Sequence, residues 1–143
     1  MNWIHWSLLS AFFAGLTAIL AKVGVTGVDS NLATAIRTTV ILLFAWAIAF
    51  ATTKPGVILE FSGRTWIFLT LSGIATGLSW LCYFKALQLG DASRVAPVDK
   101  LSVVFVILLA AVFLKEKMTL QHLVGGVLIV SGAVVMAWKS GKA

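Results

Sequence analysis

The sequence is poor in charged residues and in the side chains from which catalytic or metal sites are built. Only 11% of its 143 residues are charged, and it contains one cysteine and two histidines, whereas soluble domains are roughly 25% charged. Cys82 alone can form neither an intrachain disulfide nor a thiolate metal cluster, and two scattered histidines supply too few metal ligands. No nucleophile and base occur at a catalytic spacing either. We therefore expect no metal, no other cofactor and no enzymatic activity.

Acidic residues are scarcer than basic ones, which gives a formal net charge of +6. A nucleic-acid-binding protein gathers such charge on one soluble face. Here the basic residues occur along the whole chain, between apolar runs or at their ends. That placement is typical of anchors at a membrane interface, where anionic headgroups attract them. We expect the lipid bilayer as a partner and no nucleic acid.

Apolar residues make up 60% of the chain, and its mean hydropathy is +1.03. A helix of about 20 apolar residues crosses a hydrocarbon core of roughly 30 Å. The sequence predicts an all-α membrane protein, a five-helix transmembrane bundle forming one domain over residues 1–143. The predicted spans are about residues 4–21, 31–51, 65–89, 93–114 and 119–138, and Thr119 is expected to cap the fifth.

Hydroxyl side chains form a stripe on the third predicted span, because Ser72, Thr76, Ser79 and Tyr83 are four, three and four positions apart. Residues at this spacing share one helix face. A face of hydroxyls is unfavourable in lipid, so we expect it, with Trp80, to line the bundle interior or a water-filled cavity. The alternative is that the hydroxyls of Ser72 and Thr76 only bond backbone carbonyls of their own helix.

Four charged residues lie within the predicted spans: Arg37 in the second, Lys85 near the end of the third, and Asp99 and Lys100 early in the fourth. Because successive spans alternate in direction, all four can lie at a similar depth on one side of the membrane. Snorkelling to the interface can explain Lys85 and Lys100. Asp99 has a short side chain, and we expect it to pair with Arg37 or Lys85.

Small residues recur at helical spacing in two spans. The third contains Gly73 and Gly77 four positions apart, and the fifth contains Gly125 and Gly132 seven positions apart, on nearly the same helix face. Small residues let helix backbones approach closely in membranes. These glycines are therefore expected either at helix packing contacts within the chain or at a dimer interface.

A more specific pattern covers residues Ala86–Gly132. It comprises Gly90-x-Ala92-x-x-Val95-Ala96-Pro97, the apolar fourth span, and then Leu114-Lys115-Glu116-Lys117-Met118-Thr119-x-Gln121-x-x-Val124-Gly125 and Gly132. This pattern resembles the EamA-type repeat of the drug/metabolite transporter superfamily. Larger relatives contain two such repeats in inverted orientation, and this chain resembles one repeat alone. Ser102 stands where many repeats have a second proline, which looks like the single-repeat bacterial branch.

The resemblance implies a secondary transporter that moves a small metabolite or similar solute across a bacterial inner membrane as a homodimer, without a cofactor. Asp99 is then the candidate proton or cation site. The hydroxyl stripe and Trp80 line the path, and Arg37, Lys85 and Lys100 tune its charge or meet anionic substrates. Glu116 is expected to organise a helix end.

Two other functions stay open. A four-span small multidrug exporter would carry a coupling glutamate in its first span, but residues 4–21 contain no acid. A non-transporting accessory subunit of another membrane protein is the second alternative. Solute movement by the purified protein in liposomes would separate it from a transporter.

The sequence also leaves open in which orientation the chain inserts into the membrane. The loops on one side carry Lys54, Arg64, Lys115 and Lys117, and the other side carries Lys22, Arg94, Lys139 and Lys142. This even balance favours insertion in both orientations and an antiparallel dimer. Counting Arg37, Lys85 and Lys100 as well favours one orientation, with the C-terminus in the cytoplasm.

Overall fold

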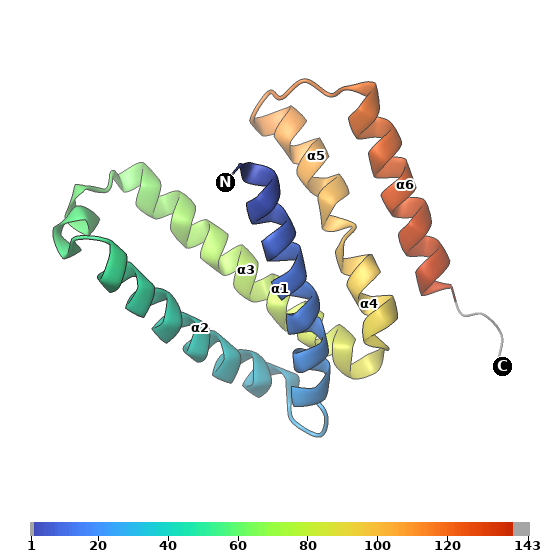
Figure 1. Ribbon diagram of the computed structural model, residues 1–143, viewed down its shortest axis with the longest axis horizontal. Coiled ribbons are helices and arrows are strands. Elements are labelled where there is room, and N and C mark those ends of the chain that lie inside the picture. The colour runs from blue at the N-terminus through green and yellow to red at the C-terminus, as the bar shows by residue number, and fades with distance from the viewer. Residues whose placement is uncertain (1, 139–143) are drawn as a thin grey trace. The chain divides into compact units, whose positions relative to one another are not determined.

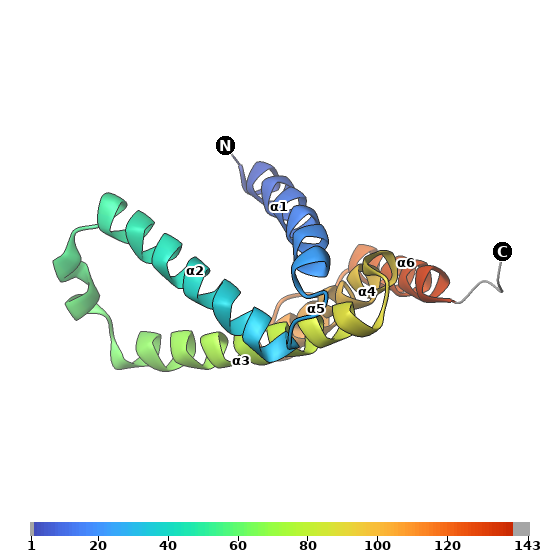
Figure 2. The same ribbon diagram turned by 90° about the horizontal axis from the view of Figure 1, so that it is seen from below.

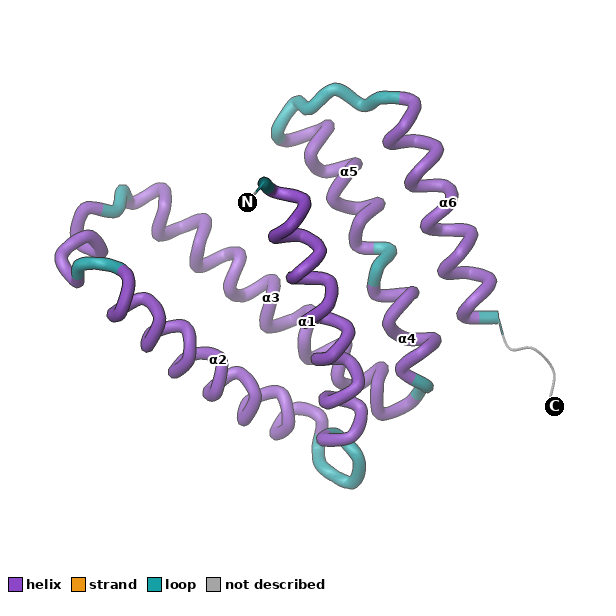
Figure 3. The backbone as a smooth tube through the Cα atoms, in the orientation of Figure 1, coloured by secondary structure: helices purple, strands orange, loops and turns teal. Residues whose placement is uncertain are grey.

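The computed structural model describes residues 2–138, which form helices joined by short loops (Figures 1 and 3). None of these residues lies in a strand, so the prediction of an all-α protein is confirmed. In chain order the elements are α1 (Trp3–Gly24), α2 (Ser30–Thr52), the 3₁₀-helix η1 (Pro55–Glu60), α3 (Gly63–Leu89), α4 (Ala92–Asp99), α5 (Ser102–Phe113) and α6 (Leu120–Ala137).

Five helical stretches in the described part of the chain are long and apolar enough to cross a membrane: α1, α2, α3, α4 with α5, and α6. Their ends differ from the predicted spans by at most three residues. Large apolar side chains on them point outward, and Phe12, Leu43 and Phe113 are each more than 60% exposed. Such exposure suits helices whose surroundings are as apolar as leucine. The chain is an integral membrane protein.

The chain divides into two compact units. One comprises Leu20–Gln88, and the other comprises Met1–Ile19 with Leu89–Ala143, of which the structure describes residues 2–19 and 89–138. Lys139 and Lys142, which enter the predicted charge balance, lie outside the described residues. The organisation of residues 1–143 as one membrane domain stays a prediction.

Within the unit Leu20–Gln88, hydrogen bonds join the segment between α1 and α2 to the end of α3. Lys22 Nζ donates a hydrogen bond of 2.6 Å to the Leu87 carbonyl oxygen, and the Gln88 amide nitrogen donates to the carbonyl oxygens of Val25 and Val28. Val25 and Leu87 are fully buried there. These bonds satisfy backbone carbonyls that a helix end leaves without partners. The start of α2 and the end of α3 therefore lie side by side, as Figure 2 also shows.

The start of α2 is capped by Asp29, whose Oδ1 accepts hydrogen bonds of 3.0 Å from the backbone amides of Asn31 and Leu32. Such a cap satisfies amides that have no partner inside the helix. Gly27, two residues earlier, has a φ of +76°, a conformation open to glycine at little cost. The segment Gly27-Val28-Asp29 therefore completes the turn after α1 and leads into α2.

In the other unit, α6 runs antiparallel to α4 and α5 and packs against both (Figure 1). Gly126 and Ala133, seven positions apart on α6, are buried. Thr119 caps α6 as predicted: its hydroxyl accepts from the His122 backbone amide at 3.3 Å, and His122 Nδ1 accepts from the Thr119 amide at 3.5 Å. This reciprocal pair is a capping box.

The end of α5 is closed by the backbone of the loop that follows it. Lys115 adopts a left-handed φ of 55°, and the Glu116 amide then donates to the Ala110 carbonyl oxygen at 3.2 Å. A left-handed residue after the last turn is a common way to satisfy carbonyls at a helix end. Glu116 thus contributes to the helix end through its backbone amide.

Candidate functional site

The fourth span is broken between α4 and α5, at Lys100 and Leu101. The amides of Leu101, Val103 and Val104 donate to the carbonyl three residues earlier, in place of the fourth residue back in an α-helix. This is one turn of 3₁₀ geometry within a membrane span. Pro97 lies inside α4, just before the break, and has no amide to donate to Ser93.

The break carries the two charged residues predicted in this span. Asp99 Oδ2 lies 3.4 Å from Lys100 Nζ, and the side chains are 34% and 57% exposed. By helical rise the pair lies about 10 Å into the span. A half-exposed ion pair contributes little to stability, so its position inside a span calls for another explanation. The predicted pairing of Asp99 with Arg37 or Lys85 stays a prediction.

Arg37 and Trp80, predicted in different spans, lie against each other in the unit Leu20–Gln88. The Arg37 Cζ atom is 4.3 Å from the centroid of the Trp80 ring and 5.4 Å from that of Phe84. Tyr83 also interacts electrostatically with Arg37. A guanidinium over an aromatic face is a cation–π contact, which strengthens when water is excluded. Arg37, Trp80, Tyr83 and Phe84 are called the Arg37 cluster below.

Two of the remaining predicted pathway residues, Lys85 and Thr76, have partners on their own helix. Lys85 Nζ lies 3.5 Å from the Gln88 side-chain oxygen, and the Thr76 hydroxyl donates to the Ser72 carbonyl oxygen at 2.9 Å. The Thr76 hydroxyl thus bonds a backbone carbonyl of its own helix, which was the alternative to lining a cavity. Ser79 is exposed on α3. Its role in a solute path stays a prediction.

Four glycines were predicted at helix packing contacts or a dimer interface. A Cβ atom built on Gly73, Gly77, Gly125 or Gly132 meets no described atom within 4 Å, leaving aside the backbone of its own helix. Gly126, next to Gly125, is buried, and a Cβ atom built on it likewise meets no described atom within 4 Å. Close packing within either unit therefore does not require glycine at these four positions, and their role at a dimer interface stays a prediction.

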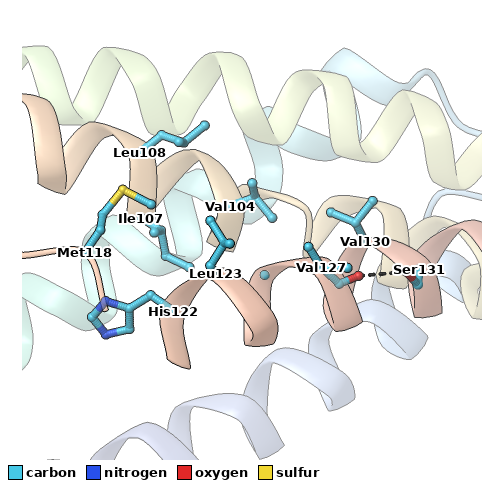
Figure 4. A pocket seen from close by; sticks show the side chains of 10 residues that line it. Val104, Ile107, Leu108, Met118, His122, Leu123, Val127, Val130 and Ser131 are labelled. Atoms are coloured by element: carbon cyan, nitrogen blue, oxygen red, sulfur yellow. Dashed lines mark hydrogen bonds between the residues drawn. The ribbon is translucent and has the colours of Figure 1, made fainter. Parts of the chain in front are cut away.

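Two apolar grooves accompany these features. One, of about 240 Å³, lies between α5 and α6 with His122 and Met118 at one end (Figure 4). Ser131, at its other end, donates its hydroxyl to the Val127 carbonyl oxygen at 2.8 Å and so leaves the groove wall apolar. The second, of about 570 Å³, lies where α2 ends and η1 begins, beside Lys54. Its walls are formed by Trp46, Ala49, Phe50, Thr53, Val57, Ile58 and Phe61.

Sequence patterns missed the bonds of Lys22 and Gln88 to backbone carbonyls. A signal was present, because both are long polar side chains at span ends, but their partners are 60 or more positions away. Among the described residues, no three His, Cys, Asp or Glu side chains are placed to hold a metal ion.

Comparison with known proteins gives a family assignment. Residues 1–138 match the EamA-like transporter family. A protein of Sinorhizobium sp., described as an uncharacterized transporter in the cobO 3'region, is 54% identical over 136 residues, covering 95% of this chain and 96% of that protein. No solved structure matches the chain. The resemblance found in the sequence is thus confirmed over nearly its whole length, and the chain belongs to the EamA-like transporter family, a family of membrane transporters.

Proposed function

We propose that the protein is a secondary transporter that moves a small metabolite or similar solute and works as a homodimer. The observation that carries this proposal is the break in the fourth span, with Asp99 and Lys100 at the turn. Discontinuous helices with charged residues near them are characteristic of substrate and coupling-ion sites in secondary transporters. Irregular backbone inside a membrane is tolerated where it lines a cavity or is covered by protein.

The break supplies the parts that such a site needs. Its amides use carbonyls three residues back, so Leu101 and Val103 leave the carbonyl oxygens of Pro97 and Asp99 to other donors or to a cation. The Asp99 carboxylate adds an acid that can hold a proton or cation, and Lys100 lies beside it. Binding and release of that ion would then change the charge at the broken turn, which would couple the ion to motion of the span.

The inverted-repeat architecture of secondary transporters also supports a homodimer. Transporters with inverted repeats bind solute between two halves, and residues 1–138 match a single family domain. A second copy would supply the other half. A relative from a bacterium supports placing the protein in the inner membrane of a bacterial cell. The transporter family also speaks against an enzyme as the principal function.

Flux measurements on reconstituted protein test this proposal. Proteoliposomes with an imposed proton gradient would be incubated with a pooled extract of small metabolites, and their contents measured by mass spectrometry. We expect at least one solute to accumulate above the level in empty liposomes. Asp99→Asn should reduce that accumulation about tenfold or more, because the amide cannot exchange a proton.

Asp91→Asn is the matched control. Asp91 lies at the start of α4, where it pairs with Arg94 at 3.8 Å, outside the broken turn. It should transport like the unmodified protein. Absence of any accumulated solute would contradict secondary transport, and full activity of Asp99→Asn in correctly inserted protein would contradict the coupling role.

A further inference from the structure

Arg37 lies inside a membrane span, beside two aromatic rings of α3. Arg37 lies seven residues after Ser30, or about 10 Å along α2. The end of α3 is fixed beside that start by Gln88, so Trp80 lies about 12 Å deep and Phe84 about 6 Å. The guanidinium is nearer the deeper ring, at 4.3 Å, than the shallower one, at 5.4 Å. The guanidinium therefore lies between the levels of these two rings, within the span.

Arg37 donates no hydrogen bond to the described residues of the unit Leu20–Gln88. Its contacts there with described residues are the two ring faces and the electrostatic interaction with Tyr83. The unit contains two carboxylates, of which Asp29 caps α2 and Glu60 lies at the end of η1. Aromatic faces balance part of the charge but accept none of the five N–H donors of a guanidinium.

We propose that Arg37 binds an anionic group, a carboxylate or a phosphate, of the solute that the protein transports. The planar guanidinium fork matches the two oxygens of either group, and stacking on Trp80 fixes the plane of that fork. In a site of low dielectric a cationic solute is repelled, and a neutral one leaves a charge without a partner. This inference rests on the proposed transport function and names its substrate class.

Anion binding tests the inference without knowledge of the natural solute. Unfolding temperature of the purified protein would be measured with benzoate, succinate, inorganic phosphate and glycerol phosphate, at constant ionic strength. Benzamide is the neutral match for benzoate, and tetraethylammonium is the cationic probe. We expect at least one anion to stabilise the protein, whereas the neutral and cationic probes do not. The carboxylate and phosphate arms distinguish the two groups.

Variants of the Arg37 cluster assign the effect to this site. Arg37→Gln should weaken anion affinity about ten- to a hundredfold, which is the usual loss when a charged hydrogen bond is removed. Arg37→Lys should retain part of the anion affinity, because the positive charge stays but the planar guanidinium with its paired donors is lost. Trp80→Leu, which keeps Arg37 but removes the stacking face, should also weaken binding if Arg37→Gln does not fold. Lys54→Gln, outside the spans, is the matched control and should bind like the unmodified protein.

Two results would overturn the inference: no stabilisation by any anion, or an unchanged response in folded Arg37→Gln. The solute-flux assay distinguishes a failure of the anion-site inference from a failure of the proposed transport function. Transport of a neutral or cationic solute, without an anion effect, keeps the transporter and removes the anion site. Anion binding through Arg37 without any flux keeps the site and removes the transporter.

Discussion

Charged side chains in the described chain serve two different purposes. Those at helix ends bind the backbone or each other: Lys22 donates to a carbonyl of α3, Asp29 accepts from amides of α2, and Asp91 pairs with Arg94. Of those inside spans, Arg37 lies away from either end of α2, and Asp99 and Lys100 lie at the break that follows α4. A charge inside a span is costly and usually marks a solute or ion path. The two groups should respond differently to substitution.

Asp29 belongs to the first group, and its substitution should change stability without changing transport. Asp29→Ala should lower the free energy of unfolding by about 1 kcal/mol, because two amides at the start of α2 lose their acceptor. Asp29→Asn should cost less, since its amide oxygen can still cap. Thermal unfolding in mild detergent, followed by circular dichroism, measures both. Equal stability of the alanine and asparagine variants would show that the cap contributes nothing.

At the scale of elements, the fourth span differs most from its sequence prediction. Hydropathy and the flanking polar residues predict one span over residues 93–114, but the structure has α4, a 3₁₀ turn and α5. Hydropathy records where a helix is apolar and not whether its amides bond three or four residues back. Pro97 lies beside the break, and a proline can kink a helix. A proline near a helix start is also compatible with an unbroken helix.

Pro97→Ala should strengthen this span and slow transport. Alanine restores an amide that can donate to Ser93, and proline inside a helix costs up to about 3 kcal/mol. We expect the unfolding temperature to rise by a few degrees, roughly as for 1 kcal/mol, and solute flux in proteoliposomes to fall. Pro55→Ala is the control, because Pro55 stands at the first position of η1, where its missing amide costs little. Unchanged flux in a stabilised Pro97→Ala protein would argue against a role for the break.

The sequence predicted local features well and long-range contacts poorly. The five spans and the Thr119 cap depend on neighbouring residues, and the structure confirms them. Arg37 and Trp80 were each singled out, but their contact depends on how α2 packs on α3. The bonds from Lys22 and Gln88 to distant carbonyls also join segments far apart in sequence. No helical periodicity can predict such pairs.

At the scale of the whole molecule, the odd number of spans places the two ends of the described helices on opposite sides of the membrane. Two-repeat transporters carry an inverted second half within a single chain. In the proposed homodimer a second copy supplies that half, and helix surfaces form the interface between copies. Small residues that face outward are suited to it.

Gly125 and Gly132 provide the test of such an interface. A side chain at either position meets no described atom within 4 Å beyond the backbone of its own helix, so Gly125→Leu with Gly132→Leu should leave each unit folded. If these glycines lie between copies, the double variant should shift the protein from dimer to monomer in mild detergent. Light scattering during size-exclusion chromatography measures this mass. The Gly125→Ala, Gly132→Ala protein should show a smaller shift, and an unchanged mass for the leucine variant would exclude these glycines from the interface.

Orientation in the membrane is tested separately. Single cysteines at Thr26 and at Glu116 lie in loops at opposite ends of spans, and Cys82→Ser removes the natural thiol. An antiparallel dimer predicts that an impermeant thiol reagent labels about half of each cysteine from outside the cell, because the flanking charges set no single direction. Labelling of one position only would establish a single orientation and contradict the antiparallel arrangement.

A change of the 3₁₀ turn after Pro97 to α geometry would couple a rotation of α5 to a change in the length of the span. An α-helix rotates about 100° and rises about 1.5 Å per residue, and a 3₁₀-helix rotates about 120° and rises about 2.0 Å. Conversion of three residues at the break to α geometry would therefore turn α5 by about 60° about its axis and shorten the span by about 1.5 Å. A face of α5 that meets α6 in one state would face elsewhere in the other. Spin labels at positions 93 and 112 would report the change in length on solute binding.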